Sequence, residues 1–102
     1  MITRNDLKAG EQIAQTAHAV SEYAWQRKWS FFKWYLRSKY IVVLAVKDLK
    51  ELNELAKSLS KELDVVRNFE PDLDNQLTAF CITPEGFLRA KKLVQKIPLA
   101  FK

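Results

Sequence analysis

The sequence predicts an α/β fold, a three-layer α/β/α sandwich around a small mixed four-stranded sheet. Segments with helical periodicity alternate with short apolar runs of strand length, which is typical of helices packed on a sheet. Hydrophobic residues make up 48% and charged residues 28% of the 102 positions, as in globular proteins. The chain has only two glycines and three prolines, too few for a linker. We therefore expect one domain spanning residues 1–102.

The N-terminal part predicts a short strand followed by a long helix. Residues 1–4 form the strand, and a turn at Gly10 leads into a helix from Glu11. An apolar stripe at helical spacing is predicted to be the buried face: Ile13, Ala17, Val20 and Ala24. A second stripe with the same spacing lies on roughly the opposite side: Glu11, Gln15, His18 and Glu22. We therefore expect His18 to lie off the buried face.

Residues 25–37 predict a second helix, with aromatic side chains on more than one face. One face carries Trp25, Trp29, Phe32 and Leu36, and the other side carries Phe31, Trp34 and Tyr35. Such a helix must cover more than one surface. We expect core packing together with an interface to a second copy of the chain, and hence a homodimer. The alternative is base stacking beside the basic residues of this helix, the arrangement used for single-stranded nucleic acid.

The middle of the chain predicts a buried strand and a capped helix. Residues 40–46 lack polar alternation, which indicates a strand buried on both faces, parallel and central. Asp48 is a good helix cap, and Glu51 three residues later completes a pair resembling a capping box. The apolar stripe of this helix is Leu49, Leu52, Ala56, Leu59 and Leu63.

The C-terminal part predicts two strands and a final helix. Residues 65–69 and 77–82 are the strands, and the turn at Pro71 is too short for a crossover helix. The two strands are therefore a hairpin or are connected at a sheet edge, and the sheet is mixed. Thr83 as cap and Pro84 in the first turn begin a helix that ends before Pro98. Its predicted buried residues are Phe87, Ala90 or the Lys91 stem, Val94 and Ile97.

Net charge and cysteine content indicate which partners and which cellular compartment to expect. A net charge of +5 favours polyanionic partners. Cys81 is the single cysteine, in an apolar run typical of the core, so an intrachain disulfide is excluded and a reducing compartment is expected. With neither a signal-peptide pattern nor a membrane-length apolar run, we expect a cytoplasmic protein. One histidine and one cysteine are too few for a zinc site, so we expect no metal and no cofactor.

Two motifs carry a resemblance to a known family. Residues 4–18, R-N-D-L-K-A-G-E-Q-I-A-Q-T-A-H, resemble the N-terminal signature of the archaeal/eukaryotic-type peptidyl-tRNA hydrolases. Residues 70–79, E-P-D-L-D-N-Q-L-T-A, are similar to a late turn of divergent bacterial members. The resemblance covers nearly the whole chain. It implies hydrolysis of the ester between a peptidyl (N-blocked aminoacyl) group and tRNA, with tRNA as the partner.

The resemblance also implies the site residues. Ester hydrolysis needs an activated water and a donor for the carbonyl oxygen as it gains charge. We expect His18 to activate water and Glu70 or Asp72 to orient His18. The catalytic candidates are His18, Glu70, Asp72 and Thr78, and the substrate-binding candidates are Arg4, Asp6, Lys8, Gln15 and Arg67.

The chain also departs from the family pattern at two places. The family has lysines in a G-K-G-K loop, where this chain has Gly10-Glu11-Gln12 and keeps only the preceding Lys8. Asn68 or Glu70 stands at the family's Asp-Ala-Gly aspartate, and we favour Glu70 because it keeps a carboxylate at the strand's exit. Two alternatives therefore stay open: a catalytically weak tRNA- or RNA-binding relative, and a structural dimeric module.

Overall fold

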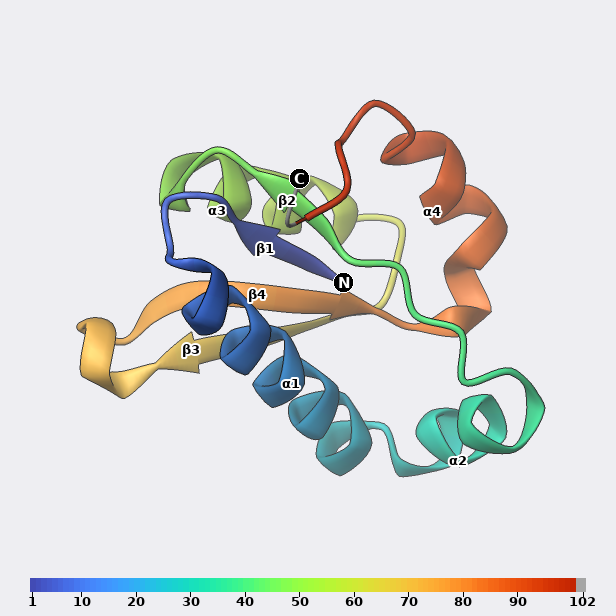
Figure 1. Ribbon diagram of the computed structural model, residues 1–102. Helices are drawn as coiled ribbons and strands as arrows, with labels where there is room; N and C mark the ends of the chain where they lie inside the picture. Colours follow the sequence, from blue (N-terminus) through green and yellow to red (C-terminus); the bar gives the residue numbers. More distant parts are fainter. Residues whose placement is uncertain (101–102) are drawn as a thin grey trace.

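The strands of the computed structural model, which describes residues 1–100, form one four-stranded sheet in the order β2-β1-β4-β3 (Figure 1). Strand β1 is parallel to β2, whereas β1–β4 and β3–β4 are antiparallel, so the predicted mixed sheet is confirmed. The strands are β1 (Ile2–Arg4), β2 (Leu44–Val46), β3 (Val65–Glu70) and β4 (Gln76–Ile82). The helices are α1 (Ala9–Gln26), α2 (Lys28–Arg37), α3 (Leu49–Leu59) and α4 (Phe87–Leu93), with short 3₁₀ turns at Pro71–Leu73 and Pro84–Gly86.

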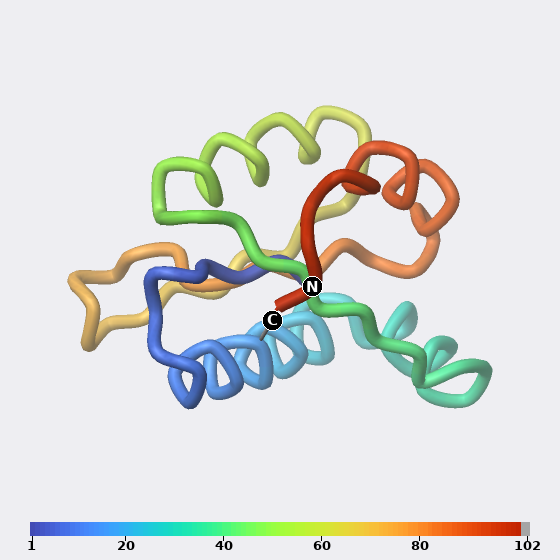
Figure 2. The backbone as a smooth tube through the Cα atoms, turned by 45° about the horizontal axis from the view of Figure 1, so that its top comes forward, coloured from blue at the N-terminus to red at the C-terminus, as the bar shows by residue number. Residues whose placement is uncertain are grey.

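Helices cover both faces of the sheet, as the sequence predicts. Figure 2 shows α1 on one side and α3 on the other. The main apolar core lies between α3 and the sheet and consists of Ile2, Val46, Leu52, Ala56, Leu59, Leu77 and Phe80. Of the predicted stripe, Leu52, Ala56 and Leu59 are buried as expected, while Leu49 and Leu63, the latter beyond the end of α3, are partly buried against this core. None of the helices described is both long and apolar enough to cross a membrane.

The start of α3 is held by the predicted cap. The Asp48 carboxylate accepts a hydrogen bond from the Glu51 backbone N–H at 3.0 Å. The Glu51 side chain in turn accepts from the Lys47 N–H at 3.0 Å. These bonds satisfy backbone donors that have no partner within the helix.

The strand predicted at residues 40–46 is shorter and lies elsewhere in the sheet. Only Leu44–Val46 form β2, which is parallel as expected but stands at the end of the strand order rather than in its centre. The prediction of a buried strand from this apolar run was wrong for its first residues, because Tyr40 and Ile41 are 66% and 48% exposed. The C-terminal segment pairs along the outer edge of β2, where the Ala45 N–H donates to the Pro98 carbonyl at 3.0 Å.

Helix α1 buries a different face from the predicted one. Its buried residues are Gln12, Gln15, Thr16, Ala19 and Tyr23, whereas Ile13 is 58% exposed. The prediction was wrong because it chose the buried face from the spacing of apolar residues alone. The sheet presents Asn68 and Thr78 to Gln15, so the buried face of α1 is polar there, while Tyr23 near the end of the helix packs on Val66 and Cys81.

The aromatic helix predicted at residues 25–37 is interrupted. Helix α1 ends at Gln26 and α2 begins at Lys28, because Arg27 leaves helical geometry (φ −132°, ψ 59°). The Arg27 guanidinium holds the corner through two bonds to the Asp64 carboxylate, at 2.7 and 2.8 Å. Phe31 and Trp34 pack against Tyr23, which gives the expected contact with the core.

The C-terminal half is largely as predicted, except for the last helix. Strands β3 and β4 form the hairpin. Cys81 is buried, and burial raises the pKa of its thiol, as suits an inert core residue. Pro84 begins a 3₁₀ turn without a side-chain cap bond from Thr83, and α4 ends at Leu93. Only Ala90 of α4 is buried, and Phe87 is 49% exposed because it faces an open cavity rather than the core.

We predict that Asp48→Ala destabilises the fold by about 1 kcal/mol, because the first turn of α3 loses its cap. Asp48→Asn should retain most of the stability, since its side-chain oxygen also accepts from the Glu51 N–H. Urea unfolding of the three proteins measures the effect. Equal stability of the alanine variant and the wild type would contradict this role for the cap.

Candidate active site

A β-bulge in the hairpin shapes the sheet face beneath α1. Asn68 pairs with Ala79 and Phe69 pairs with Leu77, so Thr78 has no partner in the β3–β4 register. The extra residue shifts the alternation of side chains along β4. Leu77 and Phe80 consequently both reach the α3 core, while the Thr78 hydroxyl reaches Gln15 of α1. Bulges commonly re-aim a side chain in this way beside functional sites.

Three buried side chains form a polar cluster between α1 and the hairpin. The Thr78 hydroxyl donates to Gln15 Oε1 at 2.7 Å. The Asn68 amide donates to Gln15 Oε1 at 3.0 Å and to Thr78 Oγ1 at 3.1 Å. Gln15, Asn68 and Thr78 are 7%, 6% and 0% exposed. Each group therefore depends on the others, because a buried polar atom without a partner is destabilising.

Glu70 joins this cluster at its rim. The Gln15 amide nitrogen donates to one oxygen of Glu70 at 3.0 Å, and the Asp72 backbone N–H donates to the other at 3.2 Å. These two hydrogen bonds lower the pKa of Glu70, and a proton on His18 lowers it further. Glu70 is therefore a carboxylate at neutral pH.

His18 lies on α1, three residues after Gln15, and its side chain is exposed. A charge on His18 lowers the pKa of Glu70, yet within residues 1–100 no hydrogen bond joins the two side chains. The imidazole is thus open to solvent beside an ionised carboxylate. Such an arrangement is suited to accepting a proton from water and stabilising the imidazolium that results.

Arg4 and Asp6 of the N-terminal motif bind each other. The Arg4 guanidinium makes a forked pair with the Asp6 carboxylate, at 2.9 and 2.6 Å, and also donates to the Gln76 side chain and the Leu77 carbonyl. The pair raises the pKa of Arg4 and lowers that of Asp6. Arg4 is only 6% exposed, so these residues fasten the β1–α1 loop to β4.

The remaining expected site residues are dispersed. Lys8 immediately precedes α1 and is exposed, and its N–H donates to the Glu11 carboxylate at 3.2 Å. Asp72 is exposed in the 3₁₀ turn after Glu70. Arg67 lies apart from the cluster, since its guanidinium is 3.5 Å from the Ser60 hydroxyl just after α3.

The structure thus brings together Gln15, Thr78 and Glu70, with His18 beside them. Arg67 and Arg4 are not part of this group. Asn68, the alternative to Glu70 in the sequence, lies deeper in the cluster than Glu70 does. In the sequence, only its place two residues before Glu70 in the expected strand pointed to Asn68. The alternation of side chains along a strand does not show which of its residues meet α1.

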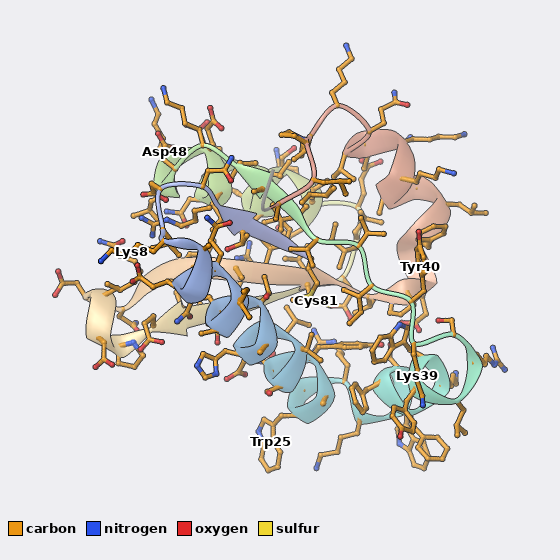
Figure 3. The ribbon with its side chains drawn as sticks, viewed as in Figure 1. Lys8, Trp25, Lys39, Tyr40, Asp48 and Cys81 are labelled. Carbon is orange, nitrogen blue, oxygen red and sulfur yellow. The ribbon has the colours of Figure 1, made fainter. Side chains whose placement is uncertain are left out.

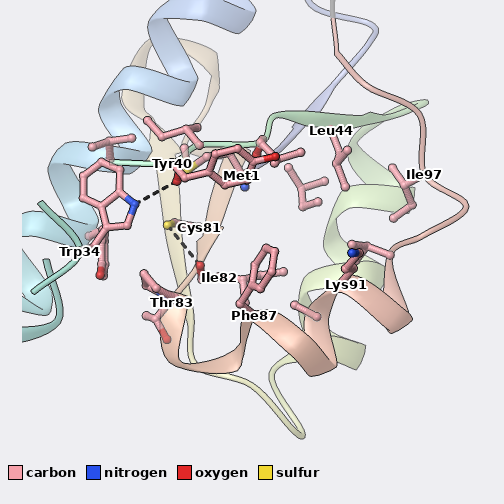
Figure 4. A pocket seen from close by; sticks show the side chains of 18 of the residues that line it. Met1, Trp34, Tyr40, Leu44, Cys81, Ile82, Thr83, Phe87, Lys91 and Ile97 are labelled. Carbon is pink, nitrogen blue, oxygen red and sulfur yellow. Dashed lines mark hydrogen bonds between the residues drawn. The ribbon is translucent and has the colours of Figure 1, made fainter. Parts of the chain in front are cut away.

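A cavity of about 880 Å³ lies at the other end of β4, away from the polar cluster. Met1, Cys81, Phe87 and Val94 are among its lining residues, and the segment before β2 forms one wall (Figure 4). The Trp34 indole N–H donates to the Tyr40 carbonyl at this wall, at 2.9 Å. Among residues 1–100, those that line the cavity include no histidine, aspartate or glutamate. Within residues 1–100, no three His, Cys, Asp or Glu side chains are grouped to hold a metal ion.

Fold and site together define an α/β domain with a histidine and a carboxylate at the exposed rim of a buried polar cluster. The family model described as Peptidyl-tRNA hydrolase PTH2 matches residues 1–99. The chain therefore belongs to the PTH2 family of peptidyl-tRNA hydrolases. A search of curated proteins finds no match.

We predict that Glu70→Gln lowers stability at neutral pH more than in acid. A carboxylate whose pKa is lowered by folding stabilises the native state when ionised, and this contribution disappears as the pH falls through the lowered pKa. Urea unfolding of both proteins near pH 7 and about pH 3 measures the difference. The exposed carboxylate of Glu54 on α3 provides a charge control, Glu54→Gln. A Glu70→Gln deficit that stays constant with pH would rule out the ionised role.

Proposed function

We propose that this chain hydrolyses the ester between the peptidyl group and tRNA at the rim of the polar cluster. The observation that supports this most is the convergence of the α1 residues Gln15 and His18 with Glu70 and Thr78 of the hairpin. Family membership supplies the reaction class. The product would be a free tRNA, so the protein would recycle tRNA in the cytoplasm, where we expect it.

In the proposed mechanism, His18 removes a proton from the attacking water. The ionised Glu70 beside it stabilises the imidazolium that forms, and the exposed position of His18 admits both water and a bulky substrate. Lys8 is exposed at the N-terminal end of α1, about 15 Å from His18 along the helix axis, and would contact a phosphate of the tRNA end rather than the reacting ester.

Thr78 has a less direct part in this proposal than the sequence suggested. Its hydroxyl is fully buried and already donates to Gln15 Oε1, so it has no proton to offer the substrate. Thr78 and Asn68 instead hold the Gln15 oxygen, which turns the Gln15 amide nitrogen toward Glu70. Thr78 is therefore a positioning residue that acts through Gln15.

We predict that His18→Ala lowers kcat/KM for N-acetylated aminoacyl-tRNA by about 10²–10⁴-fold, the usual contribution of a general base. The side chain is exposed, so the urea midpoint should stay near that of the wild type. Release of the blocked amino acid from radiolabelled substrate provides the measurement. An active His18→Ala protein would remove the histidine from the mechanism.

We predict that Thr78→Val reduces both stability, by about 1–3 kcal/mol, and turnover, on the order of tenfold to 100-fold. Valine has a similar shape but no hydroxyl, so the Gln15 oxygen loses one of its two donors and is held on that side by Asn68 alone. Thr78→Ser should preserve turnover because it keeps the hydroxyl, while the loss of a buried methyl group lowers stability by about 1 kcal/mol. Full turnover in the valine variant would show that Gln15 is held without the hydroxyl.

A second function is favoured by the first turn of α1, which begins at Ala9 and so includes the residues that the sequence assigned to a turn and loop before the helix. Gly10-Glu11-Gln12 stands where the family has lysines, and the Glu11 carboxylate bonds the Lys8 backbone N–H. In that case the chain would be a catalytically weak relative that binds tRNA. Salt-sensitive tRNA binding without turnover by the wild type would identify this binder, because phosphate contacts weaken as salt rises.

A further inference from the structure

Helix α2 presents an apolar surface to solvent and has no buried residue. Trp29, Phe32 and Leu36 are 80%, 55% and 65% exposed, and Trp25 at the end of α1 is 73% exposed. We call these four residues the α2 ridge. The inward aromatic residues, Phe31 and Trp34, already satisfy the contact with Tyr23, at centroid distances of 5.8 and 6.4 Å. The ridge therefore contributes nothing to the core.

The segment that carries the ridge is basic, and the acidic side chains next to it, Asp64 and Glu85, come from other parts of the chain and are bonded to Arg27 and Ser30. Residues 23–47 contain no aspartate or glutamate. Lys28, Lys33 and Arg37 of α2 flank the ridge, and the Lys28 ammonium lies 4.7 Å from the Trp25 ring centroid. Exposed rings interleaved with cations are the combination that single-stranded nucleic acids use, with bases on the rings and phosphates on the cations.

The Trp25 end of the ridge lies near the proposed hydrolytic site, with Glu22 between Trp25 and His18 on the same side of α1. Trp25 follows His18 by seven residues on α1, so the two lie on the same side of the helix, about 10 Å apart along its axis. Figure 3 shows Trp25 projecting from the end of α1, away from the sheet. A chain of nucleotides that places its ester beside His18 would reach the ridge with its next few residues.

We propose that the α2 ridge binds the unpaired nucleotides next to the ester-bearing end of the tRNA. Bases stack on Trp25, Trp29 and Phe32, while Lys28, Lys33 and Arg37 contact phosphates. The identity of the nucleic acid as tRNA rests on the proposed function. A two-fold dimer through the ridge would bring basic surfaces together with no acidic residue in 23–47 to oppose them. The homodimer expected from the sequence is therefore an outcome that the test must exclude.

Two substitutions of Trp29 separate stacking from simple apolar contact. Trp29→Phe keeps a ring on which a base can stack, whereas Trp29→Leu keeps an apolar side chain without one. Anisotropy of labelled, deacylated tRNA should show Trp29→Phe within about twofold of the wild-type Kd and Trp29→Leu weaker by about fivefold or more. Leu88→Ala on α4, a 77% exposed apolar position, is the control and should bind like the wild type. Equal binding by the phenylalanine and leucine variants would overturn the proposal.

A second copy of the chain or a lipid surface on the ridge would give different results in sedimentation experiments. Sedimentation that shows a wild-type dimer and a monomeric Phe32→Glu variant, with tRNA binding unchanged, would assign the ridge to a second copy. Co-sedimentation with vesicles containing phosphatidylserine, lost in Phe32→Glu while tRNA binding persists, would assign it to a lipid surface. Either result overturns the tRNA proposal.

Hydrolysis of two substrates keeps this proposal distinguishable from the proposed function. Trp29→Leu should raise KM for N-acetylaminoacyl-tRNA by about fivefold or more, with kcat unchanged. It should leave cleavage of an N-acetylaminoacyl-adenosine, which lacks the preceding nucleotides, unaltered. If His18→Ala abolishes turnover and Trp29→Leu changes neither KM nor tRNA binding, the ridge proposal fails and the enzyme remains. If the wild type cleaves neither substrate but the Trp29 variants bind deacylated tRNA as expected, the ridge stands and the hydrolase fails.

Discussion

The position of helix α1 on the sheet depends on the hydrogen bonds of the Gln15 side-chain amide. Its nitrogen donates to the Glu70 carboxylate, and its oxygen accepts from Thr78 and Asn68. The orientation of the amide is fixed by this chemistry, because a carboxylate can only accept and so requires the NH₂ group. One side chain thereby joins the helix to both strands of the hairpin and orders a carboxylate at the surface.

The two faces of the sheet serve different purposes. Beneath α3 the contacts are apolar, and residues such as Leu52 and Phe80 are completely buried. Beneath α1 a large part of the buried contact is polar and specific in its geometry. Hydrophobic contacts tolerate small shifts, whereas a hydrogen-bonded cluster loses its partners when displaced. The apolar face thus holds the sheet while the polar face sets the positions of the groups proposed for chemistry.

The sequence predicted those elements whose signals are local, and missed those that depend on distant partners. Helix α3 was recognised because its cap and its leucine stripe lie within a few residues of one another. The buried face of α1 was not, because Gln15 becomes a suitable interior residue only through Asn68 and Thr78, which lie 53 and 63 residues away. Tyr40 was assigned to a strand for a related reason, since an apolar run does not reveal whether a neighbouring strand exists to receive it. The convergence of Gln15, Glu70 and Thr78 followed from the family resemblance rather than from periodicity.

The bulge at Thr78 couples the polar cluster on one face of the sheet to the apolar core on the other. Because β4 carries one residue more than β3 across this point, its side chains are in phase with the α3 core on both sides of the bulge. Sliding the hairpin by one residue, or removing the extra one, would turn Leu77 or Phe80 out of that core. The placement of a polar group on one face is therefore locked by hydrophobic burial on the other. A residue of the cluster can be exchanged only for one that keeps its hydrogen bonds, and the register of the cluster cannot shift without loss of the fold.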